Sequence, residues 1–127
     1  MAIDKATKRI LCVAHDEGRR HDVKLLRQAK VRPHPDIRVV VDSGFQGWQK
    51  EHAKTDMPKK RSKNIPLSKA DKARNWEIAS ERTPCENVIA VLKRFKIIAD
   101  RYRNRRRRFG LRFFLIAAIY NAELAMA

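Results

Sequence analysis

The chain has 127 residues, which corresponds to one domain of ordinary size. Its 30 Lys and Arg residues outnumber its 14 Asp and Glu residues, giving a formal net charge of +16 at pH 7. This excess excludes, as the default, a small-molecule enzyme of acidic or neutral net charge. It predicts a polyanionic partner: nucleic acid ahead of an anionic membrane. At 43% hydrophobic, the sequence is too apolar for a disordered basic tail.

The cysteine count and the apolar runs indicate where such a protein would reside. Cys12 and Cys85 are the two cysteines of the sequence and cannot form a disulfide framework. The longest apolar run covers residues 113–120, whereas a membrane-spanning helix needs about 20 residues. The N-terminus has no signal-peptide core. The sequence therefore predicts a soluble, cytoplasmic protein without a membrane partner.

The first part of the chain is expected to alternate strand and helix. Residues 8–14 are partly β-branched and predict a strand, and residues 23–30 predict a short helix with Asp22 as its N-cap. The almost wholly apolar segment 37–42 is typical of a strand covered on both faces. It ends in Asp42, and open α/β sheets place their chemistry where buried strands end.

The second part is expected to be mainly helical. A short strand is indicated near Met57, and Ser68–Asp71 predicts the start of a helix that ends near Ser80. Thr83–Glu86 predicts a second helix start, for a helix over about 84–99. The apolar stripe of that helix comprises Cys85, Val88, Leu92, Phe95 and Ala99.

The end of the chain combines a basic stretch with an apolar helix. Residues 101–112 contain seven arginines and no acid, and a final helix is predicted over about 111–125. Such a run is often a solvated face or a localisation-type patch, but its charge favours non-specific, salt-dependent contact with nucleic-acid phosphates. The expected DNA-binding residues are Arg101, Arg103, Arg105, Arg106, Arg107 and Arg108.

Three charged residues of the expected second helix suggest chemistry. Helical spacing places Arg82, Glu86 and Lys93 on one face, away from Val88 and Leu92. A carboxylate is an oxygen ligand for a hard cation such as Mg²⁺, and neighbouring cations offset the charge of a phosphodiester. This pattern indicates a site that binds metal and phosphate together.

Four motifs together resemble the C-terminal part of bacterial insertion-sequence transposases of the DDE type, which have a ribonuclease-H-like catalytic domain. The motifs are Asp42–Gly47, Arg82-x3-Glu86-x6-Lys93, Arg101–Phe109 and Ile116–Asn121. The resemblance runs from about Ile3 to Leu124. It implies an α/β, incomplete ribonuclease-H-like fold over residues 1–127: a mixed sheet flanked by helices, with the first strands missing.

The resemblance also implies a reaction. Such enzymes hold two Mg²⁺ (or Mn²⁺) ions with three carboxylates, cut transposon ends, and join them to target DNA. Asp42 matches the second acid and Glu86 the third, so both are expected as catalytic metal ligands that converge in space. Arg82 and Lys93 match the arginine and lysine of the Tyr-Arg-Glu-Lys signature, whose tyrosine is replaced by Ala79.

No residue matches the family's first catalytic aspartate. This chain is therefore expected to be a truncated frame, or one half of an enzyme completed by frameshifting, and to be inactive alone. The implied partners are double-stranded transposon-end and target DNA, the upstream half of the transposase, and a second copy in a homodimer. In a bacterial cell the protein would be associated with the nucleoid when bound to DNA.

Other interpretations of these residues stay open at this stage. Glu86 could serve only in a helix cap, and Asp42 only in a turn. Asp22, beside His21, is more typical of a cap than of a ligand, and the histidines and cysteines lack zinc spacing. Phe45 and Trp48 could stack on a base, although core packing is favoured.

Two further functions remain as alternatives to the enzyme. One is a basic nucleic-acid-binding protein without catalysis, which would have no need for Asp42 at a buried strand end or for Glu86 between cations. The other is an interaction partner that inhibits full-length transposase through the helix at about 111–125, whose apolar face needs a cover.

Overall fold

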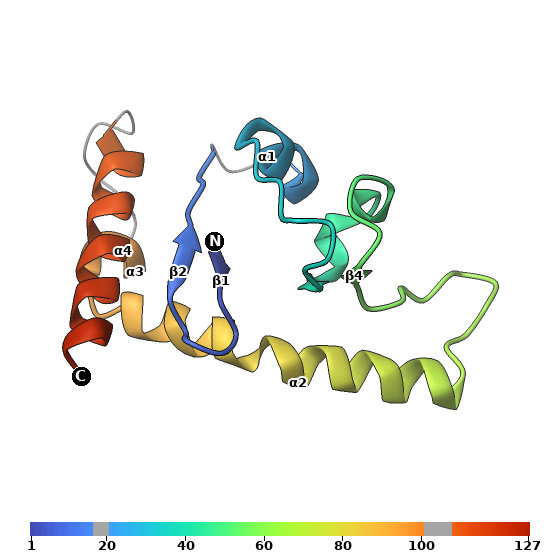
Figure 1. Cartoon of the computed structure of the whole chain (residues 1–127). Helices are drawn as coiled ribbons and strands as arrows, with labels where there is room; N and C mark the ends of the chain where they lie inside the picture. The colour runs from blue at the N-terminus through green and yellow to red at the C-terminus, as the bar shows by residue number, and fades with distance from the viewer. Residues whose placement is uncertain (17–20, 101–107) are drawn as a thin grey trace. The chain divides into compact units, whose positions relative to one another are not determined.

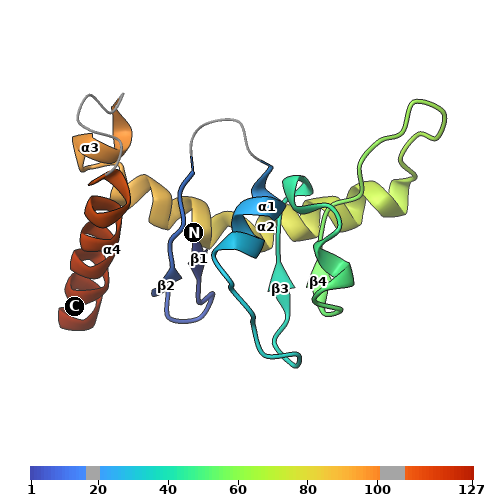
Figure 2. The same cartoon turned by 90° about the horizontal axis from the view of Figure 1, so that it is seen from above.

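The computed structural model describes residues 1–16, 21–100 and 108–127. Contacts divide the chain into two compact units: unit 1 is Met1–His15 with Pro84–Ala127, and unit 2 is Asp16–Thr83. The strands, labelled in Figures 1 and 2, are β1 (Ala2–Ile3), β2 (Ile10–Cys12), β3 (Val39–Val40) and β4 (Thr55–Asp56). The helices are α1 (Asp22–Gln28), α2 (Lys69–Leu92), α3 (Lys96–Ala99), α4 (Phe109–Met126) and the short 3-10 helices η1 (Ser43–Phe45) and η2 (Trp48–Lys50).

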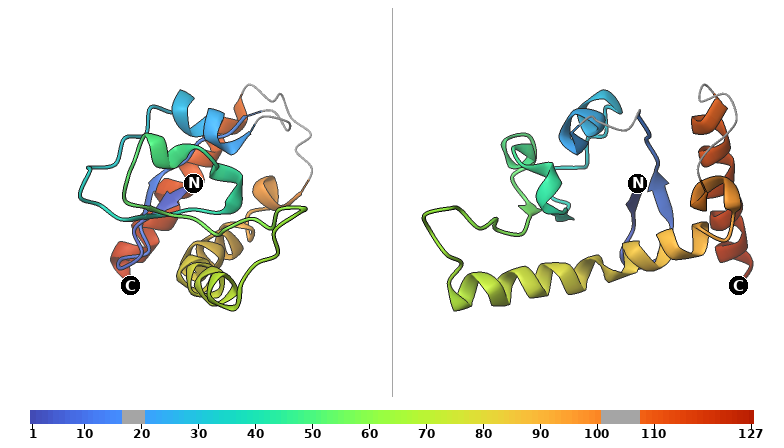
Figure 3. Two further views of the ribbon diagram at one scale, coloured as in Figure 1. Left: turned by 90° about the vertical axis from the view of Figure 1, so that its right-hand side faces the viewer. Right: turned by 180° about the vertical axis from the view of Figure 1, so that it is seen from behind.

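Unit 1 begins with an antiparallel hairpin of β1 and β2, seen from behind in Figure 3. The Asp4 carboxylate shapes its turn, because it accepts hydrogen bonds from the Ala6 N–H at 2.9 Å and the Thr7 hydroxyl at 2.6 Å. The Thr7 hydrogen bond is the main cause of a lowered pKa at Asp4. The strand expected at 8–14 is confirmed but shorter, since this turn occupies the chain up to residue 9.

The core of unit 1 joins β2 to α2 and α4. Its buried members are Ile10, Val13, Val88, Leu92, Ile116, Ala117 and Tyr120. The predicted apolar stripe is therefore confirmed at Val88 and Leu92. The helix predicted at 111–125 is confirmed as α4.

Asn121 of α4 hydrogen-bonds through its side chain to the backbone of strand β2. Its side-chain oxygen accepts the Ile10 N–H at 2.9 Å, and its side-chain N–H donates to the Ile10 carbonyl at 2.9 Å. The neighbouring Arg9 carbonyl instead accepts from the Asp4 N–H of the hairpin partner. Because backbone groups alternate in direction along a strand, Asn121 occupies the edge of β2 that faces away from β1.

Among the described residues, α4 is the one helix long and apolar enough to cross a membrane, with 22% of its window buried. Length and composition alone are weak evidence for a membrane helix. A helix in the core of a soluble protein passes the same test, and α4 supplies Ile116, Ala117 and Tyr120 to the core of unit 1.

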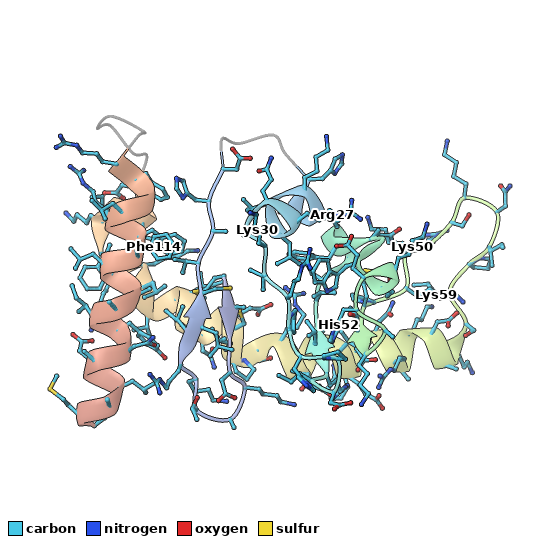
Figure 4. The ribbon with its side chains drawn as sticks, turned by 45° about the horizontal axis from the view of Figure 1, so that its top comes forward. Arg27, Lys30, Lys50, His52, Lys59 and Phe114 are labelled. Carbon is cyan, nitrogen blue, oxygen red and sulfur yellow. The ribbon has the colours of Figure 1, made fainter. Side chains whose placement is uncertain are left out.

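Unit 2 contains the parallel pair of β3 and β4, with Val39 opposite Thr55 (Figure 2). A strand is confirmed at the centre of the segment 37–42, but the expected cover on both faces is wrong, because Val39 and Val40 are half-buried and Ile37 is 54% exposed. The short strand expected near Met57 is β4. His52, labelled in Figure 4, is buried and donates from Nε2 to the Ile37 carbonyl at 2.6 Å.

Ion pairs tie the strands of unit 2 to α2. Arg38 pairs with Asp56 and also donates to Glu81 at 2.8 Å, while Arg74 of α2 lies 3.0 Å from Asp56. Burial alone would raise the pKa of Asp56, but the hydrogen bonds and charges of Arg38 and Arg74 outweigh it and lower that pKa. The same carboxylates, Glu81 first, raise the pKa of Arg38.

The start of α2 confirms the predicted cap. The Ser68 hydroxyl accepts the Asp71 N–H at 3.0 Å, and the Asp71 carboxylate accepts the Ser68 N–H at 3.2 Å. This is a capping box with aspartate at the third helical position. Lys59, which donates to Asp71 at 2.8 Å, is the main cause of a lowered pKa there.

The predicted helix break at 83–84 is wrong, because α2 is one helix from Lys69 to Leu92 with Pro84 inside it. A proline in a helix interior costs about 3 kcal/mol. Burial of Ile78, Val88 and Leu92 along α2, at about 1.5–3 kcal/mol each, offsets that cost. The boundary between units 1 and 2 falls at Pro84.

The fold class is confirmed only at the level of α/β. Instead of one mixed sheet, the described residues form two separate two-stranded sheets, one antiparallel and one parallel. Residues 93–95 also turn, so the helix expected to reach residue 99 ends at Leu92 and is followed by the short α3. Periodicity predicts which residues are apolar together, but not which strands pair.

Candidate active site

Asp42 stands where β3 and the buried Val41 lead into η1. Its Oδ1 accepts the Gly44 N–H at 2.8 Å, and it forms the N-cap of η1. Its Oδ2 lies 3.5 Å from the Arg82 guanidinium, and its side chain is 39% exposed. The turn-forming role considered for Asp42 is therefore confirmed, and its second oxygen faces a cation.

Gly44 lets a second carboxylate approach Asp42. A Cβ at Gly44 would lie 2.5 Å from Oδ2 of Asp22 and 3.0 Å from Oδ1 of Asp42. One oxygen from each aspartate therefore borders the space that Gly44 leaves open. Carboxylate oxygens around a small space are a suitable donor set for a hard divalent cation.

The predicted cap role of Asp22 is wrong. Asp22 is the first residue of α1, and His21 is the N-cap, without a side-chain hydrogen bond. The carboxylate of Asp22 lies beside Gly44 instead, a proximity that needs α1 to fold back onto η1. Sequence spacing gives no signal for it, because the rest of α1, a loop and the strand β3 separate Asp22 from Gly44 along the chain.

Glu86 and Lys93 belong to unit 1. Glu86 is exposed in the second half of α2, opposite the buried Val88, and Lys93 is exposed just after α2 ends. The capping role considered for Glu86 is wrong, because no helix begins at residues 83–86. Asp42 and Arg82 belong to unit 2, so the convergence of Asp42 with Glu86 stays a prediction.

Within residues 1–16, 21–100 and 108–127, no three His, Cys, Asp or Glu side chains gather where they could hold a metal ion. Trp48 is only 3% exposed, so the core role favoured for it is confirmed. Neither cysteine forms a disulfide bond.

The expected arginine patch falls mostly outside the described residues. Arg101, Arg103, Arg105, Arg106 and Arg107 are not described, whereas Arg108 is exposed at the N-cap of α4. Nucleic-acid contact by this stretch therefore stays a prediction.

Comparison with known proteins identifies the class. Residues 1–122 match the family of transposase DDE domains, and the chain belongs to that family. It is 41% identical over 126 residues to a probable transposase for insertion sequence element IS702 from Microchaete diplosiphon. That match covers 99% of this chain and 46% of the relative, so the chain spans less than half of the relative's length. No solved structure matches the chain.

Proposed function

We propose that this chain is the C-terminal portion of the catalytic domain of an insertion-sequence transposase, which cuts transposon ends and joins them to target DNA. The observation that carries the proposal is the geometry of Asp42: a carboxylate that follows strand β3 and the buried Val41, beside Arg82 of α2 and the second carboxylate of Asp22. The family match over residues 1–122 gives that geometry its chemical meaning.

In this proposal Asp42 and Glu86 hold Mg²⁺ or Mn²⁺, with two ions in the complete enzyme. When bound, such ions activate water and stabilise the attacking and leaving oxygens of an in-line displacement. The Gly44 N–H orients the Asp42 carboxylate, as its 2.8 Å hydrogen bond supports. Arg82 and Lys93 offset the negative charge of the phosphodiester.

The remaining carboxylate, which corresponds to the family's first catalytic aspartate, is supplied in this proposal by an upstream portion of the transposase. The DNA partners are transposon ends and target DNA, and the net charge of +16 supports a polyanionic substrate. The arginine-rich stretch 101–108 adds non-specific contact with the DNA backbone. A homodimer remains a prediction.

The test joins this chain to the upstream portion encoded at the same locus. The joined protein is expected to cut labelled terminal-repeat DNA with Mg²⁺ and to stop when EDTA removes the metal, while this chain alone binds DNA without cutting it. Cleavage by this chain alone would contradict the need for an upstream portion. DNA binding by the joined protein, with no cleavage at any Mg²⁺ or Mn²⁺ concentration, would favour the non-catalytic basic binder.

Gly44→Ala tests the carboxylate pair separately from stability. The new Cβ would displace the Asp22 carboxylate, which is the end of a movable side chain. We therefore expect Mn²⁺ affinity to fall about tenfold, and the free energy of unfolding to change by less than about 1 kcal/mol. Gly47→Ala is the matched control, because Gly47 has open space but a φ of 92°. It should cost about 1 kcal/mol of stability and leave Mn²⁺ affinity unchanged.

Paramagnetic resonance of free Mn²⁺ gives the affinity, and urea unfolding gives the stability. If Gly44→Ala and Gly47→Ala lower Mn²⁺ affinity equally, the carboxylate pair does not contribute to metal binding.

A further inference from the structure

The first half of α2 has two sides with different surroundings inside unit 2. Its inner side bonds to the rest of the unit: Asn75 bonds to the Lys59 backbone, Arg74 pairs with Asp56, and Glu81 pairs with Arg38. Ile78 on the same side is fully buried. These contacts fix the rotation of the helix about its axis and leave the opposite side facing outward.

Trp76 lies on that outward side and is 73% exposed. One turn before it is Lys72, and Ala73 and Ser80 are further neighbours at helical spacing, all of them exposed. Most of the indole ring is therefore open to solvent. An exposed tryptophan of this kind has no role in the core of unit 2.

Cations are concentrated just before Trp76 in the sequence. Between residues 57 and 72 the sequence contains six cations and a single acid, Asp71, which is paired with Lys59. The cations are Lys59, Lys60, Arg61, Lys63, Lys69 and Lys72, and all are exposed. Lys69 and Lys72 lie on the Trp76 side of α2 at helical spacing, whereas Lys59 (labelled in Figure 4) bonds through its backbone to Asn75 on the inner side.

We propose that Trp76 stacks on an unpaired base of a DNA strand whose phosphates are held by Lys69 and Lys72. A single-stranded nucleic acid offers the required pair of features, a π-face and a negative backbone. A protein partner fits less well, because the cores of protein interfaces are poor in lysine. The neighbours of Trp76 on this side of α2 also do not form an apolar patch with it. The inference rests on the proposed function, which supplies DNA as the substrate.

Tryptophan fluorescence of the whole chain provides the test, with oligothymidylate as the probe. Trp48 is buried and should keep its emission, so quenching on binding would report Trp76. Trp76→Ala should weaken oligothymidylate binding about tenfold in fluorescence anisotropy, whereas Trp76→Phe retains a stacking ring and should lose less than about threefold. Ile65→Ala, also an exposed apolar residue of unit 2, is the control and should change nothing.

Two results would overturn the proposal. One is oligothymidylate binding that leaves the tryptophan emission unchanged or that Trp76→Ala does not weaken. The other is a blue shift of Trp76 emission when the chain is joined to the upstream portion without DNA, which would assign this side of α2 to a protein contact. Failure here is distinct from failure of the proposed function, because end cleavage by the joined protein is measured separately.

Discussion

Asp42→Asn in the joined enzyme is expected to lower the rate of end cleavage at least about a thousandfold and to change DNA affinity less than about twofold. Asparagine keeps the oxygen that accepts the Gly44 N–H, so the turn into η1 should persist. It removes the negative charge that a divalent cation requires from its ligand. The change therefore separates metal-dependent chemistry from the binding of a polyanion by a chain of net charge +16.

The control for this prediction is Asp36→Asn. Asp36 is also an aspartate of unit 2, its side chain is 79% exposed, and it lies near Lys54 and His34. Cleavage and DNA affinity should both stay within about twofold of the parent, since exposed ion pairs of this kind contribute little. If Asp42→Asn weakened DNA binding as much as cleavage, the non-catalytic binding function would be favoured.

Glu86→Gln extends the same experiment to unit 1. If Glu86 and Asp42 share a metal site, Glu86→Gln should lower the rate of end cleavage to the same degree as Asp42→Asn. Glu86 is exposed and does not lie at the start of a helix, so the loss of its charge should leave the stability of α2 unchanged. Unchanged cleavage in Glu86→Gln would show that the two carboxylates do not act together.

The local signals of the sequence predicted much of this structure. The Ser68–Asp71 cap, the helix α4 and the buried pair Val88 and Leu92 follow from side-chain chemistry and periodicity, and all are confirmed. Such features depend on residues within a few positions of one another. This is why a single sequence contains enough information to place them.

The features that were missed depend on contacts between distant segments. Thr83 and Pro84 predict a helix start locally, yet α2 runs through them because its apolar residues are buried on both sides of the proline. Asp22 appears beside Gly44 only once α1 folds onto η1. The orientation of α2, which leaves Trp76 outward, likewise depends on partners such as Arg38 and Asp56.

Asn121→Leu is expected to have the largest effect on the stability of unit 1. Leucine keeps a similar volume but leaves the N–H and the carbonyl of Ile10 without their partner, and Ile10 is buried. Each unsatisfied buried group costs about 1–3 kcal/mol, so we expect a loss of about 2–4 kcal/mol in the free energy of unfolding. Urea denaturation followed by circular dichroism measures this change.

Glu123→Gln is the matched control on the same helix. Glu123 pairs with Arg94, and their side chains are 47% and 45% exposed, so the pair should contribute less than about 1 kcal/mol. Asn121→Leu should also expose the edge of β2 at Ile10 and promote self-association, which light scattering would detect. Equal unfolding midpoints for the two variants would contradict the anchoring role, because a side chain that closes a strand edge must matter more than a solvated ion pair.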